Sequence, residues 1–387
     1  MDRQPSFQLD PDIGFLADPK GQFVCGLLED AGHQALFVGG CVRNAIMGVA
    51  ASDVDIATDA QPTDVMRIAE AAGVRAVPTG IDHGTVTLIV DGTPFEITTF
   101  RRDVETDGRR AVVAFSSRVE DDARRRDFTM NALYADRRGV VQDPVGGLRD
   151  AQARRVLFID DPVQRIREDY LRTLRFFRFS AWYADPAQGW DADALAAIAD
   201  TLDGLQSLSA ERVGAEMLKL LSAPDPTPAV SVMAQVGVLG VLLPGAEARM
   251  LGPVVHMEDG AVDPITRLAA VGGENVADRL RLSRKQGKQL EATRTLAGTS
   301  RGFRALGHLA GLEAAQGAAI LRAALFETPL PEGWQADIAS GTSERFPVAA
   351  SDLPELEGAA LGKRLKALKQ DWLASDLTLG KDQLLGR

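Results

Sequence analysis

The stretch that decides the fold is ALFVGGCVRNAIMGVAASDVDIAT, residues 35–58. It opens with a short apolar run that is typical of a buried strand. Gly39-Gly40 ends the run, and a helix is predicted from about Val42 to Met47. From Asp53 to Ala57 acidic and apolar residues alternate, which indicates a half-buried strand. We therefore expect one small unit in which a strand, a glycine turn, a helix and a second strand follow one another.

The rest of the chain divides into two kinds of structure. Up to about residue 150 helical and strand-like segments alternate, and Asp91-Gly92 is a hairpin turn signal. The charged, irregular segment from Asp103 to Val119 is interpreted as a mobile loop. Helices are predicted at 18–32, 62–72, 162–181, 208–221, 229–243, 280–326 and 358–373, and further strands at 85–90, 94–100 and 131–135. The pattern predicts a mixed-sheet α/β head followed by an all-α remainder.

Composition limits the classes of function. The chain has 387 residues, of which 45% are hydrophobic and 25% charged, as is ordinary for a globular protein of more than one unit. We find no uninterrupted apolar stretch long enough for a bilayer and no basic-then-apolar signal peptide. A cytoplasmic protein without a membrane partner is therefore expected. Cys25 and Cys41 are expected to be free thiols.

Charge is unevenly distributed along the chain. The net charge of −11 disfavours a nucleic-acid partner, but the window 101–180 contains 18 Arg and no Lys against 14 Asp and Glu. Arginine offers planar, bidentate donors that suit phosphates and base edges. The window is either a solvated, ion-paired surface or a nucleotide-binding one, and the motifs on which the arginines lie favour the second.

Asp53-Val54-Asp55 is the first candidate site. Side chains at i and i+2 of a strand point to the same face, and a divalent cation relieves the repulsion between two carboxylates held there. Oxygen ligands select Mg²⁺, which can position an attacking hydroxyl and stabilise a leaving oxygen. A D-x-D match alone is weak, because most such pairs are solvated. Glu96, on a second predicted strand, is a candidate third carboxylate, although an outward-facing Glu is an equally good interpretation.

Gly39-Gly40 and Arg43 form the second candidate. Glycines after a strand let phosphates approach the backbone, and the following helix offers its N-terminal amides to an anion. Arg43 is a candidate clamp for a triphosphate. The alternative is a plain strand–helix turn, which the short spacing to Asp53 and Asp55 disfavours.

A third motif is the arginine-rich segment 124–131, RRRDFTMN. Arg126 and Asp127 are candidates for contacts to the phosphate and the ribose hydroxyls of a nucleotide. An exposed basic turn is the alternative interpretation.

The fourth motif is a predicted helix that starts near Arg165. Its polar residues recur every three positions and would share one stripe: Asp169, Arg172, Arg175 and Arg178. The stripe is either a salt-bridged helix face or a rigid set of donors and acceptors for the Watson–Crick edge of a base. In the second case protein side chains select a nucleotide without a nucleic-acid template.

In this order, the motifs resemble the class II CCA-adding tRNA nucleotidyltransferases and the bacterial poly(A) polymerases. The resemblance is dense from about residue 20 to 180 and thinner beyond. It runs through 38–43 (VGGCVR), 53–58 (DVDIAT), 78–80 (PTG) with 83–85 (HGT), 96–101 (EITTFR), 103–109 (DVETDGR), 125–131 (RRDFTMN), 168–172 (EDYLR), 208–212 (LSAER) and the tail segment 358–372.

The resemblance implies a polymerase-beta-like nucleotidyltransferase head at 1–150 and a nucleotide-selecting, RNA-binding neck at 151–225. It implies a helical body at 226–340 and a tRNA-binding tail at 341–387. The substrates would be CTP, ATP and a tRNA bound by its acceptor end and elbow, with Mg²⁺ as cofactor. The tRNA 3′-hydroxyl would attack the α-phosphate and release pyrophosphate, and the loop at 103–110 would help to switch from C to A addition.

The resemblance also implies roles for particular residues. Asp53 and Asp55 would hold the metal, and Glu96 is the candidate third catalytic carboxylate. Asp169 and Arg172 would select the base. The full set of expected nucleotide-binding residues is Gly39, Gly40, Arg43, Arg126, Asp127, Asn131, Asp169, Arg172, Arg175 and Arg178.

The chain departs from the family's pattern at two places. Asn44 follows the motif arginine where the family usually has Asp, which leaves the partner of Arg43 open. Residues 157–160 read LFID where the family often has Arg-Phe-Ile-Gly. The four scattered histidines give no reason to expect a zinc site or the phosphohydrolase domain of some relatives.

Several alternatives stay open at this point. A poly(A) polymerase, or an enzyme that adds only CC or only A, would share the motifs of the head. A non-catalytic RNA-binding module is a further alternative, which the complete set of carboxylates disfavours. The basic cluster Lys363, Arg364, Lys366 and Lys369 either contacts the tRNA elbow or is a solvated helix face.

Overall fold

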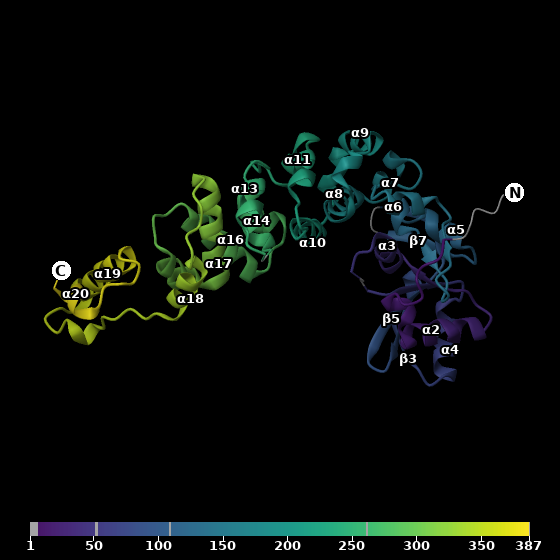
Figure 1. Ribbon diagram of the computed structural model, residues 1–387, viewed down its shortest axis with the longest axis horizontal. Helices are drawn as coiled ribbons and strands as arrows, with labels where there is room; N and C mark the ends of the chain where they lie inside the picture. Colours follow the sequence, from purple (N-terminus) through teal and green to yellow (C-terminus); the bar gives the residue numbers. More distant parts are fainter. Residues whose placement is uncertain (1–6, 51–52, 108–109, 261, 387) are drawn as a thin grey trace. The chain divides into compact units, whose positions relative to one another are not determined.

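The structure is a computed structural model that describes residues 7–50, 53–107, 110–260 and 262–386, without the side chains of 103–113 (Figure 1). The chain divides into two compact units, Met1–Ser207 and Leu208–Arg387. All of the expected catalytic and nucleotide-binding residues belong to the first unit.

A mixed sheet forms the centre of the first unit. In the described residues it has seven strands in the order β3-β4-β5-β2-β1-β8-β9. Only the pairing of β2 with β5 is parallel among the described strand pairs. The strands are β1 (Ala35–Val38), β2 (Asp55–Thr58), β3 (Arg75–Gly80), β4 (Thr85–Val90), β5 (Thr93–Thr99), β8 (Tyr134–Ala135) and β9 (Val141–Gln142). The predicted mixed-sheet α/β head is confirmed.

The helices of the first unit begin where the sequence supplies caps. The Asp18 side chain accepts from two backbone N–H groups of α2, and Pro19 and Pro62 occupy the first turns of α2 and α4. The α-helices are α1 (Gly14–Ala17), α2 (Pro19–Asp30), α3 (Gly40–Met47), α4 (Pro62–Ala71), α5 (Val119–Arg124), α6 (Gly147–Gln152), α7 (Pro162–Glu168), α8 (Leu171–Tyr183) and α9 (Ala192–Asp200). Short 3-10 turns are η1 (Ile81–His83), η2 (Thr129–Asn131), η3 (Pro186–Gln188) and η4 (Leu202–Ser207).

An aromatic cluster packs α8 onto the segment that carries the third motif. Phe128 lies 5.0 Å from Phe158 and 5.2 Å from Phe179 between ring centroids, and Phe158 stacks on Phe176 at 5.6 Å. All four rings are buried. Burial of several aromatic side chains is the main stabilising contribution expected at such a contact. It fixes α8 beside residues 126–131.

Four sequence predictions need correction. The segment interpreted as a mobile loop forms a two-stranded hairpin, β6 (Arg101–Asp107) with β7 (Arg110–Phe115), followed by α5; residues 108–109 lie outside the described residues. Strand β3 was not expected, because it carries no clear alternation and is mostly half-buried or exposed. Strand β2 begins at Asp55, two residues later than predicted.

The fourth correction concerns the helix expected at 162–181. It is two helices, because Asp169 adopts an extended conformation with φ −154° and ψ 104°. The Asp169 side chain accepts from the backbone N–H of Leu171 at 3.1 Å. Local side-chain-to-backbone bonding of this kind lets Asp end one helix and begin another.

In its described residues the second unit is built from helices and loops, with one isolated β-bridge between Ala246 and Gly272. Its apolar side chains gather in clusters, of which one contains Trp372, Leu368 and Leu373 of the last long helix. The elements are α10 (Ala210–Leu221), α11 (Thr227–Gln235), α12 (Val238–Leu242), α13 (Leu251–Met257), α14 (Pro264–Val271), α15 (Val276–Arg279), α16 (Arg284–Ala297), α17 (Phe303–Phe326), α18 (Trp334–Ser343), η5 (Ala350–Asp352), α19 (Gly358–Ala374) and α20 (Lys381–Leu385). The all-α remainder is confirmed.

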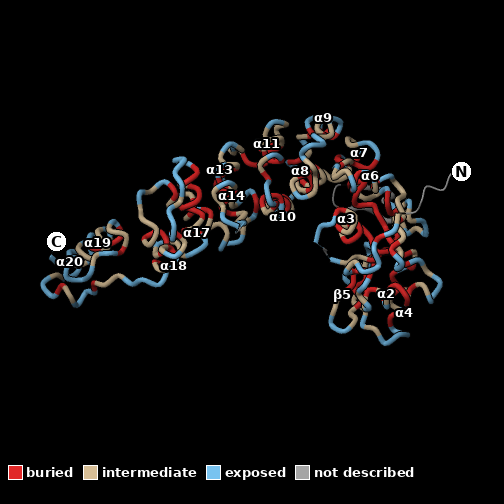
Figure 2. Tube along the Cα trace, viewed as in Figure 1, coloured by how far each residue is buried: buried red, intermediate tan, exposed pale blue. Residues whose placement is uncertain are grey.

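Among the described residues, α17 alone is long and apolar enough to cross a membrane by length and composition. Gly311 has φ 75° inside it and divides it into two shorter helical pieces. Most of α17 from Ala314 to Ala324 is buried (Figure 2), and the helix packs against α13, α14, α16 and α18. We interpret α17 as the core helix of the second unit.

Gly147, at the start of α6, should tolerate no side chain. A Cβ there would lie 2.0 Å from the carbonyl oxygen of Thr129, so the backbone that carries η2 would have to move. We expect Gly147→Ala to lower the free energy of unfolding of the first unit by about 1–3 kcal/mol. Gly14→Ala is the control, because nothing lies within 4 Å of a Cβ at that position. Urea denaturation of both variants checks this, and equal stabilities would contradict the close approach.

Candidate active site

Three carboxylates, those of Asp53, Asp55 and Glu96, lie on or next to the paired strands β2 and β5. Asp55 is the first residue of β2 and lies opposite Glu96 in the parallel pairing of the two strands. Asp53 is exposed in the segment that leads into β2. The pKa of Asp55 is raised to about 6: burial contributes most, the neighbouring Glu96 and Asp53 also raise it, and Arg126 lowers it in part. Crowded negative charge of this kind is what a bound cation relieves.

The donor set fits a hard divalent cation. Asp53 and Asp55 offer carboxylate oxygens, the ligands that Mg²⁺ prefers. Within the part of the chain that is described, no three His, Cys, Asp or Glu side chains group tightly enough to hold a metal by themselves. A cation at Asp53 and Asp55 would therefore need further ligands from a substrate or from water.

The glycine turn lies directly beside these carboxylates. Val38 pairs with Asp55 across β1 and β2, and Gly39 follows with φ 71°. That left-handed conformation favours glycine. The amide of Gly39 donates to the Leu133 carbonyl at 3.1 Å, and α3 starts at Gly40. A Cβ on Gly39 would lie 3.4 Å from Nη1 of Arg126, so the turn and this arginine are neighbours.

Arg126 is held from behind by a buried carboxylate. Its Nε and Nη2 donate to Oδ2 of Asp122 at 3.2 and 2.9 Å. The Tyr134 hydroxyl donates to the same oxygen at 2.8 Å, and Arg125 donates to Oδ1 at 2.7 Å. Burial alone would raise the pKa of Asp122, but the charges of Arg126 and Arg125 outweigh it and lower the pKa to about 2. Asp122 is therefore ionised and fully engaged at neutral pH.

Arg43 lies inside the protein in this conformation. Its side chain donates to Oδ1 of Asn44 at 3.1 and 2.8 Å and to Oδ1 of Asn131 at 2.5 Å. Its guanidinium carbon lies 4.0 Å from the ring centroid of Tyr183. Burial lowers the pKa of Arg43 from its ordinary value. The residue thus ties α3 to η2 and α8, and its predicted contact with a triphosphate stays a prediction.

Asp127 and Asn131 continue the same network. Oδ1 of Asp127 accepts from the Asn131 amide at 2.9 Å, and Oδ2 accepts from Arg175 Nε at 2.7 Å. Burial would raise the pKa of Asp127, but Arg175 and Asn131 lower it overall. Arg175 thereby joins α8 to the motif at 125–131. The aromatic cluster packs the same two segments together.

The expected base-selecting residues lie at the junction of α7 and α8. Arg172 donates to Glu168 at 2.6 Å, to the Arg165 carbonyl at 2.8 Å and to the Arg125 carbonyl at 3.1 Å. Arg165 also bonds to Glu168 and to the carbonyl oxygens of Arg125 and Arg126. Glu168, at the end of α7, is thus a carboxylate partner of Arg172 across the helix break at Asp169. Arg172, Arg175 and Arg178 still share one half-buried face of α8.

Sequence reasoning missed two residues of this network, Asp122 and Tyr134. Asp122 lies four positions before Arg126, at a spacing that brings side chains together on a helix. That spacing is a signal that could have been used. Tyr134 offered none, since its hydroxyl reaches Asp122 only through the fold of β8.

Comparison with known proteins agrees with this geometry. Residues 35–157 match the poly A polymerase head domain, and residues 191–250 match a probable RNA-binding region of polymerase A. The Mus musculus mitochondrial CCA tRNA nucleotidyltransferase 1 is 38% identical over 55% of this chain and 49% of its own length. The Geobacillus kaustophilus CCA-adding enzyme is 38% identical over 58% of this chain and 54% of its own. Each match thus spans about half of the relative.

The crystal structure of the Bacillus stearothermophilus CCA-adding enzyme in complex with CTP is similar over the whole chain. It has a TM-score of 0.76 and 28% identity, and the match covers 96% of this chain and 98% of that one. Residues 35–157 belong to the poly A polymerase head-domain family, and the whole chain is similar in fold to a CCA-adding enzyme. Members of this family generally use a divalent metal ion.

The two departures from the family's pattern have local explanations. Asn44 replaces the usual Asp and accepts two hydrogen bonds from Arg43, while its own amide donates to the Ala50 carbonyl at 2.7 Å. Asp160 stands where the family often has glycine and adopts φ 57°. Asp tolerates that left-handed region better than most residues. Neither departure removes a candidate site residue.

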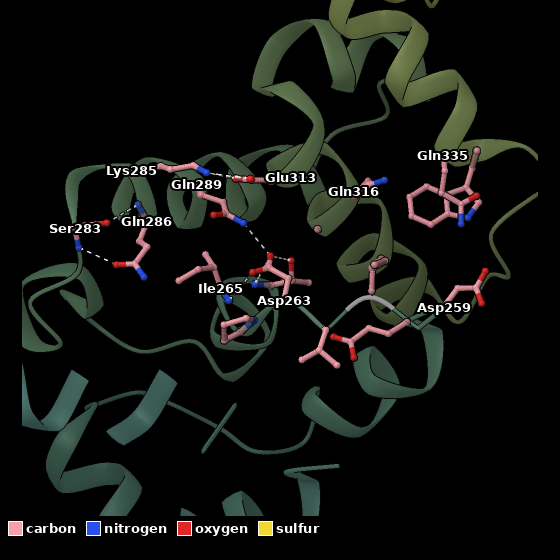
Figure 3. A pocket seen from close by; sticks show the side chains of 17 residues that line it. Asp259, Asp263, Ile265, Ser283, Lys285, Gln286, Gln289, Glu313, Gln316 and Gln335 are labelled. Atoms are coloured by element: carbon pink, nitrogen blue, oxygen red, sulfur yellow. Dashed lines mark hydrogen bonds and ion pairs between the residues drawn. The ribbon is translucent and has the colours of Figure 1, made fainter. Parts of the chain in front are cut away.

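The second unit contains a cavity of about 590 Å³ (Figure 3). No predicted catalytic or nucleotide-binding residue of the family lines it. Several of its polar side chains bond to one another: Lys285 to Glu313 at 2.9 Å and Gln289 to Asp263 at 2.8 Å. Asp263 also caps α14. These contacts account for much of the polar lining as helix-to-helix packing.

Asp55→Asn should stabilise the metal-free protein at neutral pH. Folding raises the pKa of Asp55 from 3.8 to about 6, so the folded state binds the proton more tightly and stability falls as pH rises through that window. Above about pH 6 the amide removes this destabilisation, which we put at about 1–2 kcal/mol because the side chain is partly exposed.

Chemical denaturation with EDTA between about pH 4 and pH 8 provides the measurement, with the exposed Glu70→Gln on α4 as control. The Asn variant and the wild type should converge in stability at the acid end. A variant no more stable than the wild type at about pH 8 would contradict the crowding of charge at Asp55.

Proposed function

We propose that this protein is a CCA-adding tRNA nucleotidyltransferase. It transfers CMP and AMP from CTP and ATP to the tRNA 3′ end without a template and releases pyrophosphate. The observation that carries the proposal is the position of Arg126 among the other site residues. It lies beside the Gly39 turn and acts electrostatically on Asp55 of the β2–β5 carboxylates, and the main chain of Arg125 and Arg126 bonds to Arg165 and Arg172. The relatives named above, and the CTP in the Bacillus stearothermophilus complex, support the same activity.

Asp53 and Asp55 would hold the divalent cation, which we take to be Mg²⁺. When bound, the ion would neutralise phosphate charge and lower the barrier to attack by a hydroxyl. Glu96, opposite Asp55, sets the local negative charge and would orient the attacking end of the RNA. These roles rest on the crowded carboxylates and on the family.

The protein itself would bind and orient the nucleotide. The amides at Gly39-Gly40 and the start of α3 suit a triphosphate, because N–H groups at a helix N-terminus face an anion. Arg126 adds positive charge beside that turn, and Arg43, Asp127 and Asn131 brace it from within. Asp169 and Arg172 would read the base edge, while Arg175 and Arg178 support it from α8.

We also propose the domain plan of the family for this chain. The head would occupy 1–150, the neck 151–225, the body 226–340 and the tail 341–387. The tail would bind the tRNA elbow through α19. Lys363, Arg364, Lys366 and Lys369 on that helix are exposed or half-buried and suit RNA phosphates. We place the enzyme in the cytoplasm, where it meets tRNA.

A poly(A) polymerase is the second candidate function, favoured by the head-domain match at 35–157. Both enzymes would share the carboxylates and the glycine turn. An enzyme that adds only CC or only A is a further variant of the same chemistry. The product made on a tRNA that lacks its CCA end separates all of them.

Incubation of that tRNA with CTP, ATP and Mg²⁺ should restore CCA and then stop. Asp53→Ala and Asp55→Ala should each reduce incorporation at least about 1000-fold, because the loss of metal-derived charge stabilisation costs several kcal/mol. Both variants should still bind the tRNA in a filter assay. Long A tails, a stop after CC, or full activity in both Ala variants would each refute part of the proposal.

Arg172→Ala should weaken nucleotide selection. Loss of a side chain that bonds a base edge leaves little to distinguish CTP and ATP from GTP and UTP, so the ratio of correct to incorrect incorporation should fall about 10-fold or more. Arg167→Ala, an exposed arginine of α7, is the matched control. Single-nucleotide incorporation with each of the four triphosphates gives the ratio, and an unchanged ratio in Arg172→Ala would remove the base-selection role.

A further inference from the structure

Both carboxylate oxygens of Asp122 accept hydrogen bonds from other residues of the first unit. Asp122 is fully buried, and its two oxygens take hydrogen bonds from Arg125, Arg126 and Tyr134. A carboxylate buried in this way is stable only when it is paired, and its partners are fixed in return. The three partners come from two different segments of the head.

One nitrogen of the Arg126 guanidinium, Nη1, lies beside the glycine turn and not against Asp122. Nε and Nη2 face Asp122, whereas Nη1 lies next to the Gly39 turn, 3.4 Å from where a Cβ of Gly39 would be. Arg126 also acts electrostatically on Asp55. The backbone of Arg126 is held as well, because its carbonyl accepts from Arg165. The side chain therefore has one orientation, with Asp122 behind it and the turn in front.

We propose that Asp122 is a positioning residue for nucleotide binding: it touches no substrate and acts by aiming Nη1 of Arg126 at the phosphate-binding turn. This inference rests on the proposed function, since it presumes that a nucleoside triphosphate binds at Gly39-Gly40. An aimed guanidinium loses less conformational freedom on binding than a mobile one. This role accounts for the position of Asp122 on α5, just before the motif that contains Arg126.

The experiment is a double-mutant cycle on nucleotide affinity. Asp122→Asn keeps the shape but removes the charge, and it should raise the Kd and KM for CTP and ATP about 10-fold, as is typical for a lost hydrogen bond to a charged group. The turnover number kcat should change much less. In an Arg126→Ala background the same substitution should raise Kd no more than about two-fold, because the residue it acts through is gone.

Two further variants keep the test decisive. Tyr134→Phe removes the hydroxyl that donates to Asp122 and accepts from Nε of Arg126. It should raise KM in the same direction by a smaller factor, even if Asp122→Asn folds poorly. Glu258→Gln breaks a buried ion pair with Arg267 in the second unit. It should lower the melting temperature without raising the Kd for either nucleotide.

The outcomes separate this inference from the proposed function. Multiplicative losses in the double variant, or a lower melting temperature with unchanged Kd in both Asp122→Asn and Tyr134→Phe, would overturn the positioning role. Calorimetric titration with CTP and ATP, without tRNA, measures that role by itself. A wild type that binds both nucleotides but does not restore CCA would overturn the proposed function and leave the positioning role standing.

Discussion

The buried ion pair between Asp122 and Arg126 connects the parts of the head that the site needs. Its carboxylate has no exposure and its pKa lies well below the ordinary range, because two guanidinium groups and a hydroxyl surround it. On the far side of Arg126, Asp55 is crowded by Glu96 and Asp53. The arginine therefore stands between one carboxylate that fixes it and a carboxylate cluster whose charge it partly balances. Removal of Asp122 would leave the buried charge of Arg126 without the carboxylate that it bonds to.

The helices after residue 160 are attached to the same motif by two kinds of contact. Guanidinium groups of Arg165 and Arg172 donate to main-chain carbonyls of Arg125 and Arg126. The aromatic cluster around Phe128 supplies apolar burial beside them. A change in the position of α8 is thereby passed to the backbone that carries Arg126. In the proposed enzyme, the residues that read the base and those that hold the phosphates are parts of one packed assembly.

Much of the site was predictable because it is local in sequence. The alternation at Asp53–Ala57 and the turn at Gly39-Gly40 gave the strand, the turn and the helix to within two residues. Of the expected stripe, Arg172, Arg175 and Arg178 share one helix, whereas Asp169 lies outside it because its side chain bonds to the nearby backbone between two helices. The hairpin β6–β7 was taken for a loop, because its sequence is charged and shows no regular alternation of apolar and polar residues.

The sequence by itself determined the order of the elements, the mixed-sheet head, the helical remainder and the residues that bear charge. These follow from hydrophobic period and turn chemistry, which act over a few residues. Only the tertiary structure decided which charges meet. Asp122 with Tyr134, Arg43 with Asn131 and Arg172 with Glu168 are set by burial, where each polar group must find a partner within hydrogen-bond distance. Composition and spacing cannot specify that choice, because it depends on how strands and helices distant in the chain pack together.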